Sequence, residues 1–429
     1  MKKVNEVANI VFNGENIIGL IKVDEEEKFI EFLVENLDNK DELLNDRTEK
    51  TFHCNLHNNR TISFFKCLLI NTKNSNLVRY KIGIYTDGFI ENFEEFKVSE
   101  ISAIFPKLDS WFVGNGKDLS LYSNISYEGK NVDIKFNQGK TKKRNNFSEV
   151  TETYLTITIK SDERLSIGYI DDIFFRISIL FSFLCEKYVS YSNLVYEDKE
   201  GSPIRIYQNQ QYEANDIKLN KVNYRPNSLI NNETLKDLIK PIESSLFDVW
   251  LNYVGVLRSN QLLEERFLNY ARCLEILSRN DIRNNIYTER ERSQKSKEYR
   301  ELIEQMELEK EYKDNLKEAF KFSNNKGFKT ILRELLEKYP FKEELEKLDE
   351  NNGLEKVVSN IVNLRNHLTH GSPVKEINNK SLFFYKELTK QMVVNILIHE
   401  HGASKESLDI DYLTIQYSGL PNPFNKLPK

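Results

Sequence analysis

The sequence predicts an α+β multidomain protein, in which a β-rich, sandwich- or barrel-like N-terminal domain precedes an all-α helical bundle. Its 429 residues exceed what one ordinary hydrophobic core holds, so two or three domains are expected. Runs of Ile, Val, Phe and Tyr between Asn, Asp and Gly fill the first half, whereas Leu, Glu and Lys dominate the second. We predict domains at 1–228 and 229–418, and an extended, proline-containing tail at 419–429.

The N-terminal domain is predicted to consist of strands joined by tight turns. Thr151–Lys160 alternates apolar and polar residues, as a strand with one solvated face does. Asn13-Gly14 and Asp87-Gly88 are typical hairpin turns. Ile167–Tyr188 is predicted to form a helix that packs against the sheet. Other strands are expected at Val7–Phe12, Phe29–Val34, Thr61–Ile70 and Val78–Tyr85.

The second half carries apolar residues at helical spacing. Thr288–Phe322 is predicted to be one long, charged, exposed helical run with i,i+4 ion pairs. Leu354–Leu368 is predicted as a helix that Gly371 and Pro373 end, and Phe383–His399 as the last long helix. Apolar stripes lie at Leu262, Leu263, Phe267, Tyr270, Ala271, Leu274 and Leu277, and at Leu332, Leu335 and Leu336.

Composition limits the partners and the compartment. A hydrophobic fraction of 39% with 30% charged residues suits a folded protein. Because the net charge is -5, an RNA partner would need a local basic surface. Four cysteines without a CxxC pair fit a reducing cytoplasm. We expect no signal peptide, since no uninterrupted apolar stretch follows Met1–Glu6. We expect no membrane partner, since the most apolar window, Ile170–Leu184, is short and contains three charged residues.

The segment Arg365-Asn366-His367-Leu368-Thr369-His370 holds the residues best suited to catalysis. RNA carries a 2′-hydroxyl beside each scissile phosphate, and its attack needs a base, an acid and positive charge on the phosphate. Histidine titrates near neutral pH and serves either proton role, while arginine binds phosphate oxygens. Asn366 can orient a neighbour or a phosphate. No metal is required, and a twofold dimer would bring two copies together.

A purely structural interpretation of this segment remains open. An Arg and a His near the end of a helix often cap its carbonyl groups and interact favourably with the helix dipole. Short motifs recur by chance, so spacing alone does not decide between the two interpretations.

The same residues carry a family resemblance. Arg365-Asn366, three further residues and His370-Gly371 resemble the R-x4-6-H signature of HEPN domains. Phe267–Arg279 resembles an early helix of the ApeA-like HEPN group. The N-terminal region, above all Phe105–Phe112, resembles the ApeA N-terminal domain, so that the resemblance covers nearly the whole chain.

This resemblance implies a metal-independent endoribonuclease without a cofactor, acting as a homodimer or higher homo-oligomer in defence against phage. It assigns the catalytic site to Arg365, Asn366 and His370, with His367 as a neighbour of no defined role. Glu275, on the early helix, is a candidate partner that orients Arg365, or else a solvated or capping Glu. Transfer RNA or another structured RNA is the implied substrate, and the β-rich domain would regulate the nuclease or sense a phage-derived trigger.

Two rival functions stay open beside this one. The first is a catalytically silent HEPN module that binds RNA or a partner protein. The second is an adaptor whose β domain binds a ligand while the helices serve as a dimerisation platform. Replacing Arg365 or His370 tests the first rival, and removing residues 1 to about 230 tests the second.

Other candidate sites are weaker. His53, Cys54, His57 and Cys67 match no common zinc spacing, so no metal site is expected there. Lys142, Lys143 and Arg144 lie in a basic segment that contacts nucleic acid or forms a solvated hairpin tip. The basic residues between Glu289 and Lys321 could line an RNA groove. By default His399 and His401 cap the last helix or lie on the surface, and a substrate contact is the alternative.

Overall fold

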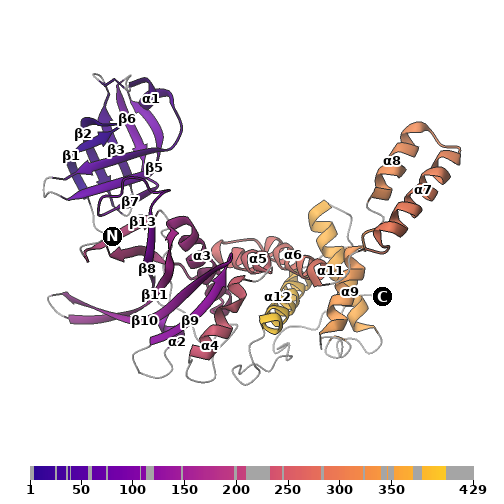
Figure 1. Ribbon diagram of the computed structural model, residues 1–429. Coiled ribbons are helices and arrows are strands. Elements are labelled where there is room, and N and C mark those ends of the chain that lie inside the picture. The colour runs from indigo at the N-terminus through magenta and orange to yellow at the C-terminus, as the bar shows by residue number, and fades with distance from the viewer. Residues whose placement is uncertain are drawn as a thin grey trace. The chain divides into compact units, whose positions relative to one another are not determined.

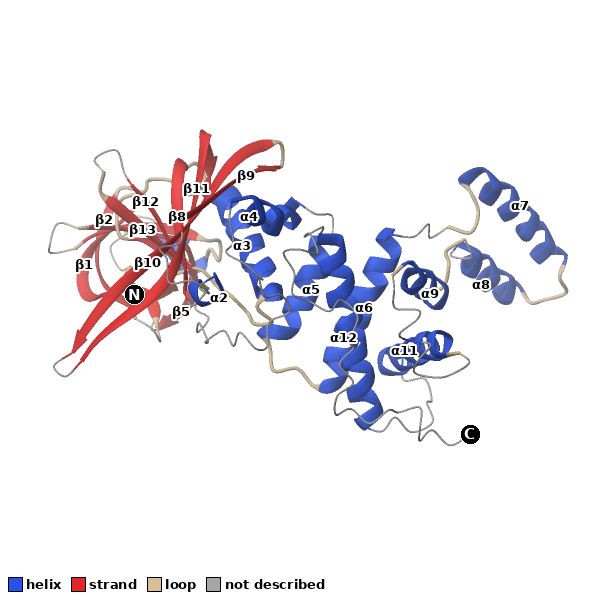
Figure 2. Cartoon of the chain, turned by 90° about the horizontal axis from the view of Figure 1, so that it is seen from below, coloured by secondary structure: helices blue, strands red, loops and turns tan. Residues whose placement is uncertain are grey.

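The structure of the chain is a computed structural model, shown in Figures 1 and 2. It describes residues 4–24, 27–34, 37–38, 40–56, 60–73, 76–106, 108–112, 120–145, 148–197, 201–208, 232–243, 246–281, 285–321, 324–339, 345, 352–370 and 379–401. These residues form two compact units, one ending at Glu243 and the other beginning at Leu246. The first contains the strands and the second is helical, so the predicted fold class is confirmed.

Six antiparallel strands of the first unit close into a barrel. Their order is β4-β1-β2-β3-β6-β5, and the pairing of β5 with β4 completes the ring. Asn13 and Gly14, both at positive φ, form the predicted two-residue turn between β1 and β2. The strands are β1 (Val4–Phe12), β2 (Glu15–Val23), β3 (Lys28–Leu33), β4 (Lys50–Asn55), β5 (Thr61–Lys73) and β6 (Leu77–Lys81).

Side chains fill the interior of the barrel. Alternate residues of the strands face inward and are buried, and aromatic rings dominate the centre. The Phe52 ring centroid lies 5.2 Å from that of Phe12, 5.7 Å from that of Phe32 and 5.0 Å from that of Tyr80. Gly19 faces the same interior, where a Cβ would lie 2.8 Å from the carbonyl oxygen of Glu31. The barrel is therefore a packed core that tolerates no side chain at this position.

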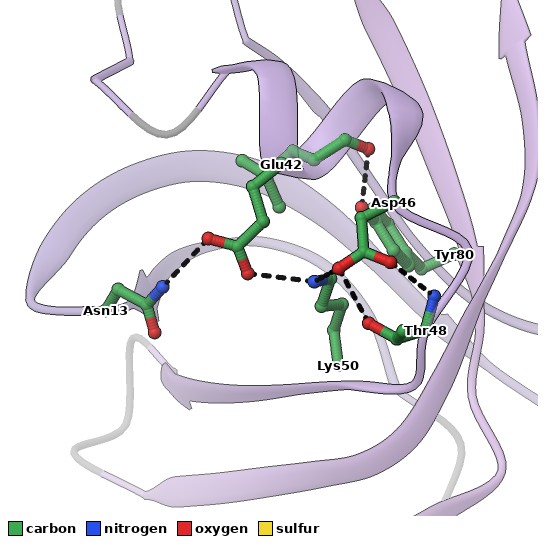
Figure 3. A network of polar contacts seen from close by, with 7 residues as sticks. Asn13, Glu42, Asp46, Thr48, Lys50 and Tyr80 are labelled. Carbon is green, nitrogen blue, oxygen red and sulfur yellow. Dashed lines mark hydrogen bonds and ion pairs between the residues drawn. The ribbon is translucent and has the colours of Figure 1, made fainter.

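A polar network fastens helix α1 (Lys40–Asn45) to the barrel (Figure 3). The Lys50 side chain is only 6% exposed, and its ammonium donates to a Glu42 oxygen at 2.8 Å and an Asp46 oxygen at 2.6 Å. The Tyr80 hydroxyl donates to the Leu43 carbonyl at 2.6 Å. Because two partly exposed carboxylates accept from the buried ammonium, the network holds the helix without leaving the Lys50 charge unpaired.

Beyond the barrel the ladder continues into an open sheet of seven strands, in the order β7-β13-β12-β8-β11-β10-β9. β6 and β7 pair with successive parts of β5, and the register with β6 shifts by one residue between Leu69 and Asn71. Gly83 separates them, and a Cβ there would lie 2.7 Å from the Lys66 carbonyl oxygen. The strands are β7 (Ile84–Thr86), β8 (Lys97–Pro106), β9 (Ser120–Tyr127), β10 (Lys130–Asn145), β11 (Ser148–Ser166), β12 (Ser192–Glu197) and β13 (Pro203–Gln208).

Helices cover this open sheet. α3 (Ile167–Leu184) packs against β8 and β11, which confirms the predicted helix and ends it four residues early. The short α2 (Asp109–Phe112) lies in the same core, where the Trp111 and Phe181 ring centroids are 5.4 Å apart. Among the described helices, none is both long and apolar enough to cross a membrane.

The edge strand β9 is covered by α4 (Asn232–Ile239) and the 3-10 turn η2 (Lys240–Glu243). The Asn232 side-chain oxygen accepts a hydrogen bond from the Tyr122 backbone N–H at 2.9 Å. Although α4 follows the predicted boundary at residue 228, it packs in the first compact unit.

The second unit is built around α6 (Leu263–Asp281), which packs against α5, α9, α11 and α12. The expected apolar stripe of α6 is buried at Phe267, Tyr270, Leu274 and Leu277, whereas Leu262 lies before the helix and is 68% exposed. The neighbouring helices are α5 (Phe247–Arg258), α9 (Phe328–Lys338), α11 (Gly353–His370) and α12 (Asn379–His401).

The prediction of a single helical run from Thr288 to Phe322 is wrong. The chain forms two helices, α7 (Glu289–Gln305) and α8 (Lys310–Lys321), because Met306 adopts an extended backbone and ends α7. The Lys317 ammonium pairs with the Glu304 carboxylate across the two helices. This ion pair joins two helices, whereas the predicted i,i+4 pairs would lie within one helix. α7 and α8 pack together as a helical hairpin (Figure 1).

Candidate active site

The candidate catalytic residues lie at the C-terminal end of α11. The apolar face of this helix is buried against α6 and α9 through Leu354, Val357, Val358, Ile361 and Leu364. On the next turn the chain becomes progressively more exposed, and His370 is the last helical residue. Packing of the apolar face thus fixes the direction of the helix and leaves its last turn accessible.

A second contact fixes α11 against α12. The Asn360 side-chain amide donates to the Tyr385 hydroxyl at 2.5 Å. Burial raises the pKa of Tyr385 to about 12, so the phenol stays neutral at physiological pH. This hydrogen bond lies in the helix segment just before Arg365.

Arg365 is held from three directions. Its Nη2 donates to Oε2 of Glu275 on α6 at 3.1 Å, and its Nη1 donates to Oδ1 of the adjacent Asn366 at 3.1 Å. The guanidinium carbon lies 6.0 Å from the ring centroid of Phe328, the first residue of α9. The Arg365 side chain is 29% exposed, so the guanidinium is oriented and still reachable by a phosphate.

Glu275 joins two arginines. Its Oε1 accepts from Nη2 of Arg279, one turn further along α6, at 2.9 Å, while Oε2 accepts from Arg365. The exposed fractions of the side chains are 40% for Arg279, 29% for Arg365 and 20% for Glu275. Two guanidinium groups around one carboxylate leave a net positive charge at the surface, which suits a phosphodiester.

Arg279 was not singled out from the sequence. The signal that could have found it is the Glu275-x3-Arg279 spacing, which places both residues on one face of a helix. That spacing is common on solvated helices. Only the contact with Arg365, 90 residues away in sequence, distinguishes this pair.

The two histidines of the segment lie near the arginine on the same helix. His370 is exposed and His367 is partly buried. A step of five residues along an α-helix is one full turn plus about 140°. The side chains of Arg365 and His370 in one chain therefore point in different directions around α11. The hydroxyl of Thr369 donates to the Arg365 carbonyl at 2.7 Å within this last turn. Gly371 and Pro373, the expected end signals, lie outside the described residues.

The weaker candidates lie elsewhere. Lys142, Lys143 and Arg144 belong to β10, where they pair with Thr151, Val150 and Glu149 of β11 in a long hairpin. The Nδ1 atom of His399 lies 3.6 Å from a Glu400 oxygen on the exposed end of α12, and His401 is the last residue of that helix.

Of the four residues considered for a metal, the structure describes His53, Cys54 and Cys67. The Cys54 and Cys67 thiols are buried in the barrel, and burial raises the pKa of both. The neighbouring His53 is half-buried and its ring bonds to the Ser63 hydroxyl at 3.0 Å, and His57 lies outside the described residues. Among the residues that the structure describes, no group of three or more His, Cys, Asp or Glu is placed to hold a metal ion.

Comparison with known proteins gives two family matches. Residues 268–407 match the Apea-like HEPN family, and residues 9–242, more than half of the chain, match ApeA N-terminal domain 1. No curated protein and no solved structure shows a significant match. HEPN domains are generally ribonucleases, and they typically bind RNA and form dimers. Glu275 and Arg279 on α6 and Arg365, Asn366 and His370 on α11 all lie within the Apea-like HEPN match. The two matches together show that the chain belongs to the ApeA-like HEPN proteins.

Proposed function

We propose that the protein is a metal-independent endoribonuclease of antiphage defence, which cleaves host RNA and thereby arrests growth. The observation that carries the proposal is the Arg365 guanidinium, which Glu275 and Asn366 orient and which is left 29% exposed, with the exposed His370 five residues further along the same helix. Membership of a family of ribonucleases supports the same interpretation.

The reaction would follow the chemistry of the 2′-hydroxyl. His370 of one protomer accepts the 2′-hydroxyl proton while the 2′-oxygen forms a bond to phosphorus. Arg365 stabilises the charge on the non-bridging oxygens, and the bond from phosphorus to the 5′-oxygen breaks. A protonated His370 from a second protomer gives its proton to that 5′-oxygen. The products are a 2′,3′-cyclic phosphate and a 5′-hydroxyl.

A homodimer or higher homo-oligomer completes this mechanism. One imidazole cannot act as base and as acid in the same step, and the helix geometry separates Arg365 from His370 within one chain. A twofold axis near the end of α11 would place the Arg365 of one protomer beside the His370 of the other. We further propose transfer RNA or another structured RNA as the substrate, and regulation by the β-rich unit in response to a phage-derived trigger.

The deciding experiment compares wild-type protein with the Arg365→Ala and His370→Ala variants on total RNA, with and without EDTA. We expect cleavage by the wild type in both conditions, cyclic phosphate ends, and loss of cleavage and of cell toxicity in both variants. His399→Ala is a matched control at the end of α12 and should retain activity. Cleavage that survives in both site variants would contradict the catalytic proposal and favour a silent HEPN module.

A further inference from the structure

The hairpin of α7 and α8 has a small apolar core of its own. The two helices pack mainly against each other. Among the described side chains of the hairpin, Ile303 is the one buried apolar residue, and Leu316 is half-buried. Helices of this length gain most of their stability from packing an apolar face against other elements. The hairpin is therefore expected to pack against a further surface.

Both ends of the hairpin are fixed by hydrogen bonds. Where the chain enters and leaves it, the Ile286 N–H donates to the Asn324 carbonyl at 2.8 Å, and the Tyr287 N–H donates to the buried Asn324 side-chain oxygen at 2.7 Å. At the opposite end, the Lys313 ammonium donates to the Glu304 carbonyl at 2.8 Å. The hairpin thus presents a defined surface.

Large apolar side chains are exposed at the tip of the hairpin, which we define as residues 301–312. Single exposed apolar side chains are ordinary, but several within one short stretch form a patch that usually marks an interaction site. The side chains are between 43% and 64% exposed and belong to Leu302, Met306, Leu308 and Tyr312. Because α7 ends and α8 begins in this stretch, they gather at one end of the hairpin.

Charge is separated along the hairpin. The tip contains five acidic residues and one basic residue, whereas the root, residues 289–300 and 313–321, contains eight basic and five acidic residues. The Lys317 ammonium of the root pairs with the Glu304 carboxylate of the tip, which offsets one charge of each sign. The tip remains negative and the root positive.

An acidic and apolar tip selects among possible partners. Its negative charge repels RNA and anionic lipid surfaces. A complementary surface carries positive charge and apolar side chains. The root of a second hairpin offers both, because basic residues are in excess there and the neighbouring Ile286 is 52% exposed. The ring of Tyr299 in the root is partly exposed as well.

We propose that the hairpin of α7 and α8 is a self-association element, in which the hairpins of two copies of this chain lie antiparallel and the tip of each contacts the root of the other. A twofold axis makes the two contacts identical, so one separation of charge serves both. The contact covers the exposed apolar side chains of both tips. The inference rests on the proposed function only in requiring that the protein self-associates. Association is measured without RNA, so its failure and that of the nuclease proposal are distinguishable.

The test reverses charge at exposed positions of the full-length protein. The tip variant combines Glu301→Lys, Glu307→Lys and Glu309→Lys, and the root variant combines Arg290→Glu, Lys297→Glu and Arg300→Glu. The control variant makes the same change of net charge as the tip variant at exposed glutamates outside the hairpin, through Glu95→Lys, Glu163→Lys and Glu337→Lys.

A second pair of variants tests the apolar contact. Leu302→Ser removes one exposed leucine from the tip, and Leu262→Ser removes an exposed leucine that lies before α6 as its matched control. Sedimentation velocity over a series of protein concentrations gives the dissociation constant of self-association for each protein.

We expect the tip and root variants each to associate at least about tenfold more weakly than wild type, because like charges then face each other. An equimolar mixture of the two should regain wild-type affinity, since the reversed tip meets the reversed root. Leu302→Ser should weaken association, and both controls should behave as wild type. The proposal is overturned if wild type is monomeric at every concentration, if both charge variants associate as tightly as wild type, or if the mixture associates no better than either variant alone. Weaker RNA binding by the root variant with unchanged self-association would also overturn it.

Discussion

The Arg365 guanidinium donates to the Glu275 carboxylate at 3.1 Å, and this contact ties the end of α11 to the middle of α6. The two residues stand 90 positions apart, so only the helix packing brings them together. The contact sets the direction in which the guanidinium points. It therefore links the stability of the bundle to the geometry of the proposed nuclease site.

Replacing Glu275 by Gln should lower the rate of RNA cleavage by roughly tenfold to a hundredfold, because a misplaced catalytic group costs about that much. We expect kcat to fall more than KM rises, since Arg365 remains present and charged. Single-turnover kinetics on a defined RNA would measure the two effects. Glu264→Gln, on the first turn of α6, is the matched control. Equal losses in both variants would show that Glu275 has no positioning role.

Arg279 shares the Glu275 carboxylate with Arg365 and is 40% exposed, so we expect it to contact an RNA phosphate. Arg279→Gln, made in a His370→Ala background that cannot cleave, should weaken RNA binding. The slope of log affinity against log salt concentration should fall by about 1, as expected for one lost phosphate contact. Fluorescence anisotropy at several salt concentrations measures it. An unchanged slope would assign Arg279 to the helix surface alone.

Features of the fold that depend on neighbouring residues could be predicted from the sequence. Asn13-Gly14 demands a tight turn, and the apolar spacing from Leu354 to Leu364 marks one buried helix face, so both features follow from neighbouring residues. The break at Met306 has no Gly or Pro to announce it, which is why one long helix was expected. The contact between Glu275 and Arg365 and the closure of β5 onto β4 join distant segments, so neither has a signal in the neighbouring residues.

The buried Lys50 predicts acid sensitivity of the barrel. The hydrogen bond from Lys50, together with those from Thr48, lowers the pKa of Asp46 from 3.8 to about 2. Since the folded-state pKa is lower than the unfolded one, this group stabilises the fold above about pH 4, and the contribution is lost as pH falls toward 2. Lys50→Met should flatten that part of the pH dependence of unfolding. Denaturant titrations between pH 5 and 2 measure it, with Lys22→Met as the control on an exposed pair.

Gly83 marks where the barrel and the open sheet separate, and a Cβ at this position would lie 2.7 Å from the Lys66 carbonyl oxygen. Because that obstacle is backbone, it cannot rotate away. Gly83→Ala should therefore lower the free energy of unfolding by more than about 1 kcal/mol. Gly168→Ala is the matched control, since a Cβ in α3 meets nothing within 4 Å and alanine favours the helix. Chemical denaturation of both variants measures the difference. Equal stability would mean that β5 can move away from Gly83 without cost, although β5 pairs with β6 and β7 on both sides of this position.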